Sequence, residues 1–409
     1  MSKCIWIINE YAGSIYHGME FRHYYLAIRL QELGYRVVII SGSYSHLYQK
    51  QPDCKSIVEH EVIDGIDYYW IRVINYGAST SKKRILKWFQ FSSKLFLLGF
   101  INIQKPDYIL LSPMATLPVV PGYLLAKLKK SKFLIEIKDI WPLTLMEIGG
   151  YSKHNPFIWT LRKFEVFGLT HADAIISNIP GYGAYLTENH IKRSFTFIPN
   201  GIDLRGDIEE QEIPKELGSK VPLGKFVVGY AGTVGLANGL EYLIEAAKIL
   251  KYMNQIVFVI VGDGSNKRKI VSKASDLQNV IFLPAIPRQQ IQSVLRKFDV
   301  CFIGWRRKDF YKYGVAANKL FDYMLSGKPI LESIDSKLNL VDQASCGLCV
   351  ESESPRAIAD GVLKLFSMSK DELQRLGNNG KEYVLKYHTY TTLAKQLKEV
   401  LDGLESAAL

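Results

Sequence analysis

A lysine stands near the start of an expected helix in the stretch "GVAANKLFDYMLSGKPI", residues 314–330. The apolar spacing predicts a helix over about residues 317–326, ended by Gly327 and followed by Pro329. In the first turn Lys319 opposes the helix dipole by roughly 0.3–1 kcal/mol unless an anion is present. A diphosphate would reverse the sign of this effect, because the lysine and the first helical amides would share one anionic partner.

The residues that follow Lys319 extend this candidate site. Asn318 and Asp322 are four apart and share a helix face, and the carboxylate of Asp322 could accept two hydrogen bonds from a ribose diol. The buried side of the helix is predicted to consist of Leu320, Phe321 and Met324. The stretch therefore predicts a ligand with a nucleoside and a diphosphate.

Two glycine-rich turns in the second half of the chain follow expected strands and precede expected helices. They are "AGTVGLANGLEYL" and "IVGDGSNKRKI", and such turns can cradle phosphates. A single glycine turn is weak evidence of a phosphate site. Lys267 and Arg268 follow the second turn, and we expect them to face water. The residues of these turns predicted to contact the ligand are Gly232, Thr233, Gly262 and Gly264.

The loop "NEYAGSIYHGMEFRHYYLA" lies directly after the first expected strand and before a helix. It lacks the G-x-G-x-x-G spacing of a dinucleotide site, but a glycine such as Gly18 lets a ligand approach the backbone. His17 and Glu20 are polar groups at the end of the helix where a ligand would bind, so both are catalytic candidates. The alternative for Glu20 is an ordinary first-turn residue that suits the helix dipole.

An acid also follows an expected strand in "EIKDIWPLTLMEIGG". Asp139 precedes Trp141 and Pro142, which prevent regular structure from continuing. Its carboxylate could take a proton from an acceptor hydroxyl or orient a sugar. The alternative is that Asp139 only caps the following turn.

The elements that must position these residues form two series of alternating strands and helices. Alternation of this kind predicts α/β architecture with parallel, doubly wound sheets, and ligands that bind beyond the carboxyl ends of the strands. We expect one Rossmann-like domain over residues 1–200, a polar linker over 201–224 and a second Rossmann-like domain over 225–387, facing each other across a cleft.

The positive charge of the chain is concentrated in one segment. The formal net charge is +11, and residues 68–135 contain eleven basic residues against the single acid Asp107. Within it, the basic-aromatic stretch 82–100 suits a helix lying in the interface of an anionic membrane, or equally a core helix with a solvated basic face. The five cysteines are scattered, and the N-terminus lacks the pattern of a signal peptide. We expect a cytoplasmic protein, peripheral at the inner face of the cell membrane.

Taken in order, the motifs "YAGSIYHGMEFRHYYLA", "EIKDIWPLTL", "ADAIISN", "IPNGID", "AGTVGLANGLEYL", "VGDG" and "NKLFDYMLSGKPI" resemble a known family across essentially the whole chain. The family is the retaining GT-B glycosyltransferases of family 4, of the type found in bacterial capsule and O-antigen biosynthesis. The resemblance implies transfer of a sugar, with retention, from a nucleoside diphosphate donor that is often UDP-linked. It implies no metal and no cofactor.

The resemblance also assigns roles to residues. It implies that Asp322 binds the ribose of the donor, that Asp139 lies near the reacting sugar, and that a C-terminal helix over about 388–403 packs back on the N-terminal domain. The catalytic candidates are Asp139, His17 and Glu20. The expected donor-binding set is Gly18, Gly232, Thr233, Gly262, Gly264, Arg306, Ala317, Asn318, Lys319, Leu320 and Asp322.

Two positions depart from the pattern of the family. Gly314 stands where an acid usually helps to hold the donor sugar, and Asn238 stands where a basic residue is expected in the first glycine turn. The phosphate partners are therefore expected to be Arg306, Arg307 and Lys319.

Because no carboxylate nucleophile is evident, the expected mechanism is a front-face attack in which the leaving diphosphate helps to take the proton of the acceptor. The expected acceptor is polyprenyl-linked or a saccharide, in surface polysaccharide synthesis. One alternative is a sugar-nucleotide 2-epimerase of the same fold. Another is a non-catalytic protein that binds membranes through the basic segment; no nucleic-acid motif is present, so a nucleic-acid partner is not expected.

Overall fold

The computed structural model describes residues 2–18, 21–77, 81–204 and 210–406, and the chain divides into two compact units. Unit 1 comprises Met1–Pro199 together with Tyr390–Leu409, and unit 2 comprises Asn200–Thr389. The segment 201–224 differs from the expected linker, because Ile202, Ile213 and Val221 are buried in the core of unit 2. The linker was predicted because most residues of this segment are polar, and the three apolar residues among them were not given weight.

Unit 1 is built on an eight-stranded sheet with the order β3-β4-β2-β1-β5-β6-β7-β8, in which β3 and β4 pair antiparallel and the other neighbours pair parallel. Its central strands are continuous apolar runs because helices cover both faces. The strands are β1 (Cys4–Ile8), β2 (Arg36–Gly42), β3 (Val58–Ile63), β4 (Ile66–Ile71), β5 (Tyr108–Leu111), β6 (Lys132–Ile137), β7 (Ala174–Ser177) and β8 (Thr196–Phe197).

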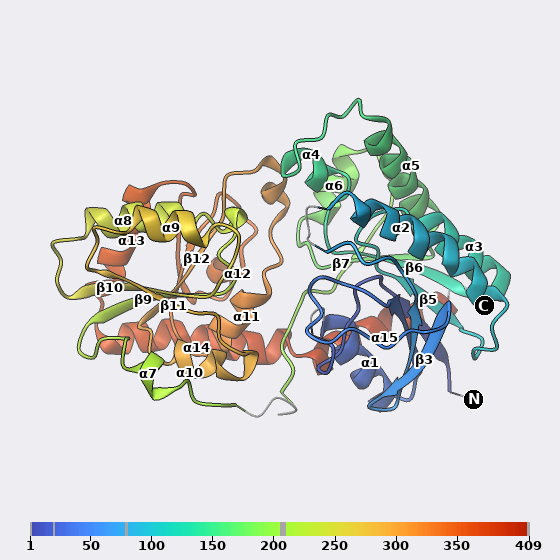
Figure 1. The fold of residues 1–409 in the computed structure, drawn as a ribbon, viewed down its shortest axis with the longest axis horizontal. Helices are drawn as coiled ribbons and strands as arrows, with labels where there is room; N and C mark the ends of the chain where they lie inside the picture. Colours follow the sequence, from blue (N-terminus) through green and yellow to red (C-terminus); the bar gives the residue numbers. More distant parts are fainter. Residues whose placement is uncertain (1, 19–20, 78–80, 205–209, 407–409) are drawn as a thin grey trace. The chain divides into compact units, whose positions relative to one another are not determined.

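The helices of unit 1 form a layer on each face of this sheet (Figure 1). Helices α1 and α15 pack on one face, and α2, α3 and α5 cover the other. The helices are α1 (Phe21–Glu32), α2 (Lys83–Lys94), the 3-10 helix η1 (Leu95–Gly99), α3 (Val119–Lys129), α4 (Leu143–Glu147), α5 (Pro156–His171), α6 (Tyr182–Glu188) and α15 (Tyr390–Ser406).

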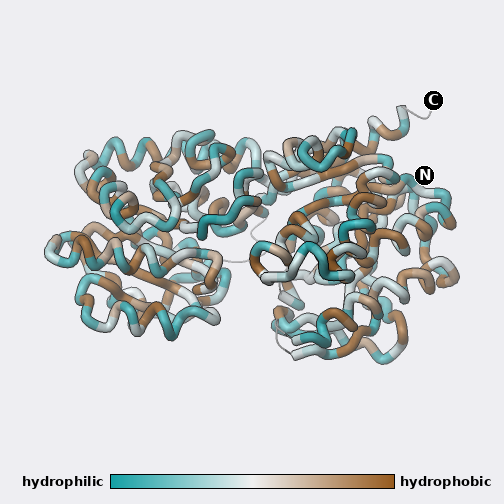
Figure 2. The backbone as a smooth tube through the Cα atoms, turned by 90° about the horizontal axis from the view of Figure 1, so that it is seen from above, coloured by the Kyte–Doolittle hydropathy of each residue, from teal (hydrophilic) through white to brown (hydrophobic). Residues whose placement is uncertain are grey.

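Unit 2 is built on a six-stranded parallel sheet with the order β11-β10-β9-β12-β13-β14. Hydrophobic residues concentrate in the strands of both units (Figure 2). The strands are β9 (Phe226–Ala231), β10 (Ile256–Val261), β11 (Val280–Leu283), β12 (Val300–Gly304), β13 (Ile330–Ser333) and β14 (Gly347–Val350).

The helices of unit 2 also lie in two layers, with α8, α9 and α13 on one face of the sheet and α10, α11 and α14 on the other (Figure 1). The α-helices are α7 (Lys215–Gly218), α8 (Leu240–Ile249), α9 (Lys267–Lys273), α10 (Ile291–Leu295), α11 (Asn318–Leu325), α12 (Leu340–Gln343), α13 (Pro355–Phe366) and α14 (Lys370–Tyr387). The 3-10 helices are η2 (Leu236–Asn238), η3 (Arg288–Gln290) and η4 (Asp309–Tyr313).

The last helix of the chain belongs to unit 1. Helix α15 buries Leu393, Leu397 and Leu401 in the core cluster that contains α1, and the ring centres of Tyr25 and Tyr390 lie 5.1 Å apart. The first and last segments of unit 2 lie side by side. Ile202 N near its start donates to the carbonyl oxygen of His388 near its end at 2.8 Å.

None of the helices in the described part of the chain is long and apolar enough to cross a membrane.

Candidate functional site

The side chain of Lys319 joins three elements of unit 2. Its Nζ donates to the hydroxyl of Tyr230 in β9 at 2.8 Å and to Oδ1 of Asn238 in η2 at 2.6 Å. Burial lowers the pKa of Lys319 to about 7. Asn238, the residue that stands where a basic group was expected, therefore holds the ammonium group of Lys319 in its place.

The helix that carries Lys319 begins close to its predicted start. Helix α11 spans Asn318–Leu325, and Ala317 precedes it without a capping side chain. Because the first amides of a helix have no carbonyl partner within it, they remain available to a ligand. The predicted buried side is confirmed, since Leu320, Phe321 and Met324 are all buried, while Asn318 is exposed.

The first glycine turn lies against Lys319, and the second glycine turn lies against the first. A Cβ atom on Gly232 would lie 3.3 Å from Cε and 3.4 Å from Nζ of Lys319, so the glycine leaves room for the ammonium group. A Cβ on Gly262 would lie 1.9 Å from the carbonyl oxygen of Gly232, and one on Gly264 would lie 2.5 Å from that of Val234. The glycines are therefore required where the two turns pack together, and a phosphate is not needed to explain them.

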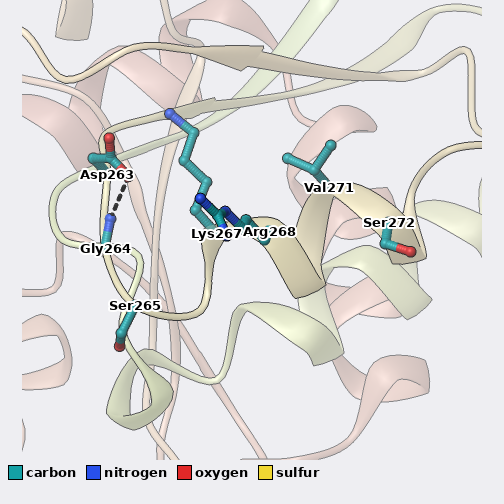
Figure 3. Close-up of a pocket in the computed structure, with 7 residues that line it drawn as sticks. All are labelled: Asp263, Gly264, Ser265, Lys267, Arg268, Val271 and Ser272. Carbon is teal, nitrogen blue, oxygen red and sulfur yellow. Dashed lines mark hydrogen bonds between the residues drawn. The ribbon is translucent and has the colours of Figure 1, made fainter.

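A pocket of about 840 Å³ opens beside the second glycine turn (Figure 3). Lys267 Nζ donates to the carbonyl oxygen of Gly262 at 2.6 Å, and Gly264 N donates to Asp263 Oδ1 at 2.7 Å. Arg268 is exposed, whereas Lys267 is only half-exposed and bonds to the turn. The pocket is lined by Asp263, Gly264, Ser265, Lys267, Arg268, Val271 and Ser272.

The carboxylate of Asp322 already has a cationic partner. Arg288, the first residue of η3, places NH1 and NH2 each 3.3 Å from one carboxylate oxygen. Burial raises the pKa of Asp322, and the Arg288 guanidinium opposes this rise. Arg288 was not among the predicted site residues; its signal in the sequence was a basic residue in the segment "LPAIPRQQ", between the end of β11 and α10.

The two arginines expected at the phosphates are ion-paired with carboxylates of unit 2. Arg306 pairs with Glu241 in α8, and Arg307 pairs with Asp335 at 2.7 Å and with Glu351 at 2.9 Å. Lys319, by contrast, bonds to neutral groups. Gly314 has φ +91°, a left-handed conformation that favours glycine, so an acid at this position would be strained.

In unit 1 the two described catalytic candidates, His17 and Asp139, lie at different parts of the sheet. His17 is buried beside the β3–β4 hairpin, with Nε2 3.6 Å from Glu61 and its ring centre 4.9 Å from that of Trp70. Burial lowers the pKa of His17, and Glu61 opposes this. Asp139 is exposed and follows β6, with β2, β1 and β5 between that strand and the hairpin. Glu20 lies outside the described residues.

Gly18, the expected donor contact in unit 1, has a structural explanation of its own. Its φ is +79°, and a Cβ on it would lie 3.0 Å from Cγ of Gln49. Thr233, in unit 2, accepts from Tyr230 and Asn238 through its backbone carbonyl at 2.6 and 2.9 Å. The same Tyr230 and Asn238 side chains bind Lys319, so Thr233 belongs to the Lys319 cluster.

A buried charged cluster at the end of β1 was missed from the sequence. Lys87 in α2 donates to the carbonyl oxygen of Glu10 at 3.0 Å, and its Nζ lies 3.4 Å from the ring centre of Tyr11. Arg84 Nε and Trp88 Nε1 donate to the Tyr11 hydroxyl at 3.0 and 2.9 Å. Burial lowers the pKa of Lys87 to about 7, opposed by Glu10, and burial raises the pKa of Glu10. The helical spacing of residues 84, 87 and 88 was the available signal.

Residues 211–383 match the family described as "Glycosyl transferases group 1". The chain carries a glycosyl transferase group 1 domain. This domain lies within unit 2 and contains Lys319, Asp322 and both glycine turns.

A relative from Escherichia coli (strain K12), "Putative colanic acid biosynthesis glycosyl transferase WcaI", is 25% identical over 308 residues, which cover 70% of this chain and 73% of the relative. The chain is therefore similar in sequence to a protein named for polysaccharide biosynthesis.

Solved structures show the same fold over the chain length. Sucrose-phosphate synthase from Thermosynechococcus elongatus matches with a TM-score of 0.74 at 17% identity, covering 99% of this chain and all of that one. HepE from Anabaena, in complex with UDP-glucose, matches with a TM-score of 0.66 at 14% identity, covering 98% of this chain and 99% of that one. The predicted α/β fold of the GT-B class is confirmed.

Proposed function

We propose that this protein transfers a sugar from a UDP-sugar donor to a saccharide or lipid-linked acceptor. The single observation that carries the proposal is the Lys319 ammonium group, held against the first glycine turn at the start of α11 in a glycosyl transferase group 1 domain. A relative named for colanic acid biosynthesis and a fold neighbour crystallised with UDP-glucose support the substrate class.

The surroundings of Lys319 favour an anion as the missing partner. Within the described residues, no carboxylate lies within ion-pair distance of its Nζ, and its hydrogen-bond partners are the Tyr230 hydroxyl and the Asn238 amide oxygen. A buried ammonium group is stabilised by a negatively charged partner, and a diphosphate would supply that charge. It would also meet the first amides of α11, which favour negative charge. Asp322 with Arg288 is our candidate for the ribose.

We propose transfer with retention by front-face attack. The acceptor oxygen forms a bond to the anomeric carbon while the bond from that carbon to the diphosphate breaks on the same face of the sugar. The acceptor proton passes to an oxygen of the leaving diphosphate, whose charge Lys319 and the α11 amides stabilise. Asp139 is our candidate for orienting the acceptor, and the scheme uses neither a metal nor a cofactor.

For the acceptor we propose a polyprenyl-linked saccharide of surface polysaccharide synthesis, met at the inner face of the cell membrane. The name of the relative and the basic-aromatic stretch 82–100 support this assignment. The chemistry of such an acceptor is amphiphilic, so an enzyme that uses it must work at a lipid surface.

Nucleotide binding and product stereochemistry test this function. We expect UDP and UDP-sugars to raise the melting temperature, since a ligand at 100 times its Kd adds about 2.7 kcal/mol to stability. NMR of the product should show the anomeric configuration of the donor. An inverted product or a covalent glycosyl-enzyme would refute the front-face scheme, and conversion of a UDP-sugar to its epimer without acceptor would identify an epimerase. If no nucleoside diphosphate stabilised the protein, the proposal would fail.

A further inference from the structure

Helix α2 directs two of its cations into unit 1 and leaves two of its large apolar side chains exposed. Lys87 and Arg84 bond to Glu10 and Tyr11 in the loop after β1, called here the β1 loop. Phe89, on the other side of the helix, is 49% exposed. The pattern continues through η1 to Phe100, which is 85% exposed. The exposed apolar side chains of this segment are Leu86, Phe89, Phe96, Leu97 and Phe100.

Helix α3 extends this apolar surface. A Cβ on Gly99 would lie 2.6 Å from Leu128, and Lys129 Nζ donates to the carbonyl oxygen of Gly99 at 3.1 Å, so η1 lies directly on α3. Leu124 and Leu128 of α3 are themselves exposed. The helices α2, α3 and α5 cover the same face of the unit 1 sheet (Figure 1).

Between α3 and α5 lies a pocket of about 530 Å³ with a mainly apolar lining. Trp159 at its edge is 57% exposed, and the Nζ of Lys163 lies 3.7 Å from its ring centre. A large exposed aromatic ring with a lysine against it suits a boundary between hydrocarbon and water. The pocket is lined by Val120, Trp159, Arg162, Lys163, Phe164, Val166 and Phe167.

The charge of this surface has one sign. The sequences of α2, η1 and α3 contain no acid, and the single acid of α5, Glu165, is buried and bonded to Arg162 and Tyr185. The exposed cations of this surface lie at the start of α2, at the end of α3 and in α5. They are Lys82, Lys83, Lys127, Lys130 and Lys163.

We propose that the surface formed by α2, η1, α3 and α5 docks on an anionic phospholipid bilayer. Phe100, Trp159 and the pocket enter the hydrocarbon boundary, and the exposed lysines meet the headgroups. This docking surface rests on the proposed function, because a lipid-linked acceptor gives the enzyme a reason to bind a membrane. The cations that meet the headgroups differ from those of the basic-aromatic stretch 82–100. They come from α3, α5 and the start of α2. Arg84 and Lys87, which lie in the stretch 82–100, bond to the β1 loop and do not face the membrane.

Vesicle co-sedimentation tests the partner. The full-length protein is mixed with vesicles of phosphatidylcholine alone, or with 30 mol% phosphatidylglycerol, at low and high salt. We expect binding to the anionic vesicles that weakens as salt screens the charges. Equal binding to both vesicle types, or no binding together with self-association in analytical ultracentrifugation, would overturn the proposal, the latter in favour of a second copy of this chain.

Matched substitutions test the surface itself. Phe100→Asp and Trp159→Asp should each lower binding to anionic vesicles at least tenfold, whereas Val62→Asp, at an exposed residue of the edge strand β3, should not. Lys127→Glu with Lys130→Glu should lower it on the order of 25-fold, from about fivefold per lysine. The control pair Lys251→Glu with Lys364→Glu in unit 2 should change it little. Equal losses in test and control variants would overturn the assignment.

The stabilisation of each variant by UDP separates this proposal from the proposed function. The nucleotide site lies in unit 2, so Phe100→Asp and Trp159→Asp should keep the full thermal shift with UDP, which also shows that they fold. A wild-type protein that binds anionic vesicles but not UDP would refute the transferase and leave the docking surface standing. One that binds UDP but no vesicles would do the opposite.

Discussion

At the scale of single residues, Lys319 carries most of the chemistry of the candidate site. Its buried ammonium group has two neutral partners, on β9 and η2, and a glycine leaves space beside it. The ion pairs of Arg306 and Arg307 show why a count of basic residues does not locate an anion site. A cation that already has a carboxylate partner gains less from a phosphate than one that has none.

Removing the charge of Lys319 should weaken nucleotide binding. We expect Lys319→Met to lower UDP affinity roughly 10- to 100-fold, because a hydrogen bond to a charged group contributes about 1.5–3 kcal/mol. Isothermal titration calorimetry measures the change. Lys364→Met, at an exposed lysine of α13, is the matched control. Unchanged UDP affinity in Lys319→Met would show that the diphosphate binds elsewhere.

Nucleotide binding should also depend on pH through the same lysine. Burial holds the pKa of Lys319 near 7 in the free protein, whereas a bound diphosphate favours the charged form and raises that pKa. Above pH 7 the lysine must therefore take up a proton on binding, and UDP affinity should fall about tenfold per pH unit. Titrations between pH 7 and 9 measure the slope, which Lys319→Met should abolish. A flat profile in the wild type would contradict this.

At the scale of elements, two of the strands have only a weak signal in the sequence. β3 is an antiparallel edge strand with half-exposed side chains, and β14 has only four residues, all partly exposed. The sequence of β3, VEHEVI, mixes apolar and polar residues, and that of β14, GLCV, is apolar but very short, so each gives a weaker signal than the longer apolar strands. α11 was found because glycine and proline mark its end. The pairing of Asp322 with Arg288, and of Lys87 with the Glu10 loop, joins distant segments, which periodicity does not reveal.

Helix α15 should be essential to the stability of unit 1. Leu397 is buried in the cluster around α1, so Leu397→Ala should cost about 2–5 kcal/mol of the free energy of unfolding. Urea unfolding followed by circular dichroism measures this cost. Lys395→Ala, at an exposed position of the same helix, should cost less than about 0.5 kcal/mol. Equal effects of the two substitutions would mean that α15 is not packed as described.

At the scale of the whole molecule, the two units have separate cores and separate chemistry. Hydrogen exchange should show the division. UDP should slow amide exchange in residues 230–238 and 318–325 of unit 2, where Lys319 joins β9, η2 and α11, and leave the strands of unit 1 unchanged. Slower exchange in unit 1 alone would show that UDP binds unit 1 and would contradict a nucleotide site in unit 2.

The assignment of α15 to unit 1 has a consequence during protein synthesis. Residues 1–199 are translated before unit 2, yet the core around α1 needs leucines of α15, which are translated after unit 2. Unit 2, which is continuous in sequence, can complete its fold while unit 1 still lacks a helix. The side of α1 that packs on α15 therefore stays uncovered until α15 has been translated. A nascent chain halted before residue 390 should be a substrate for chaperones.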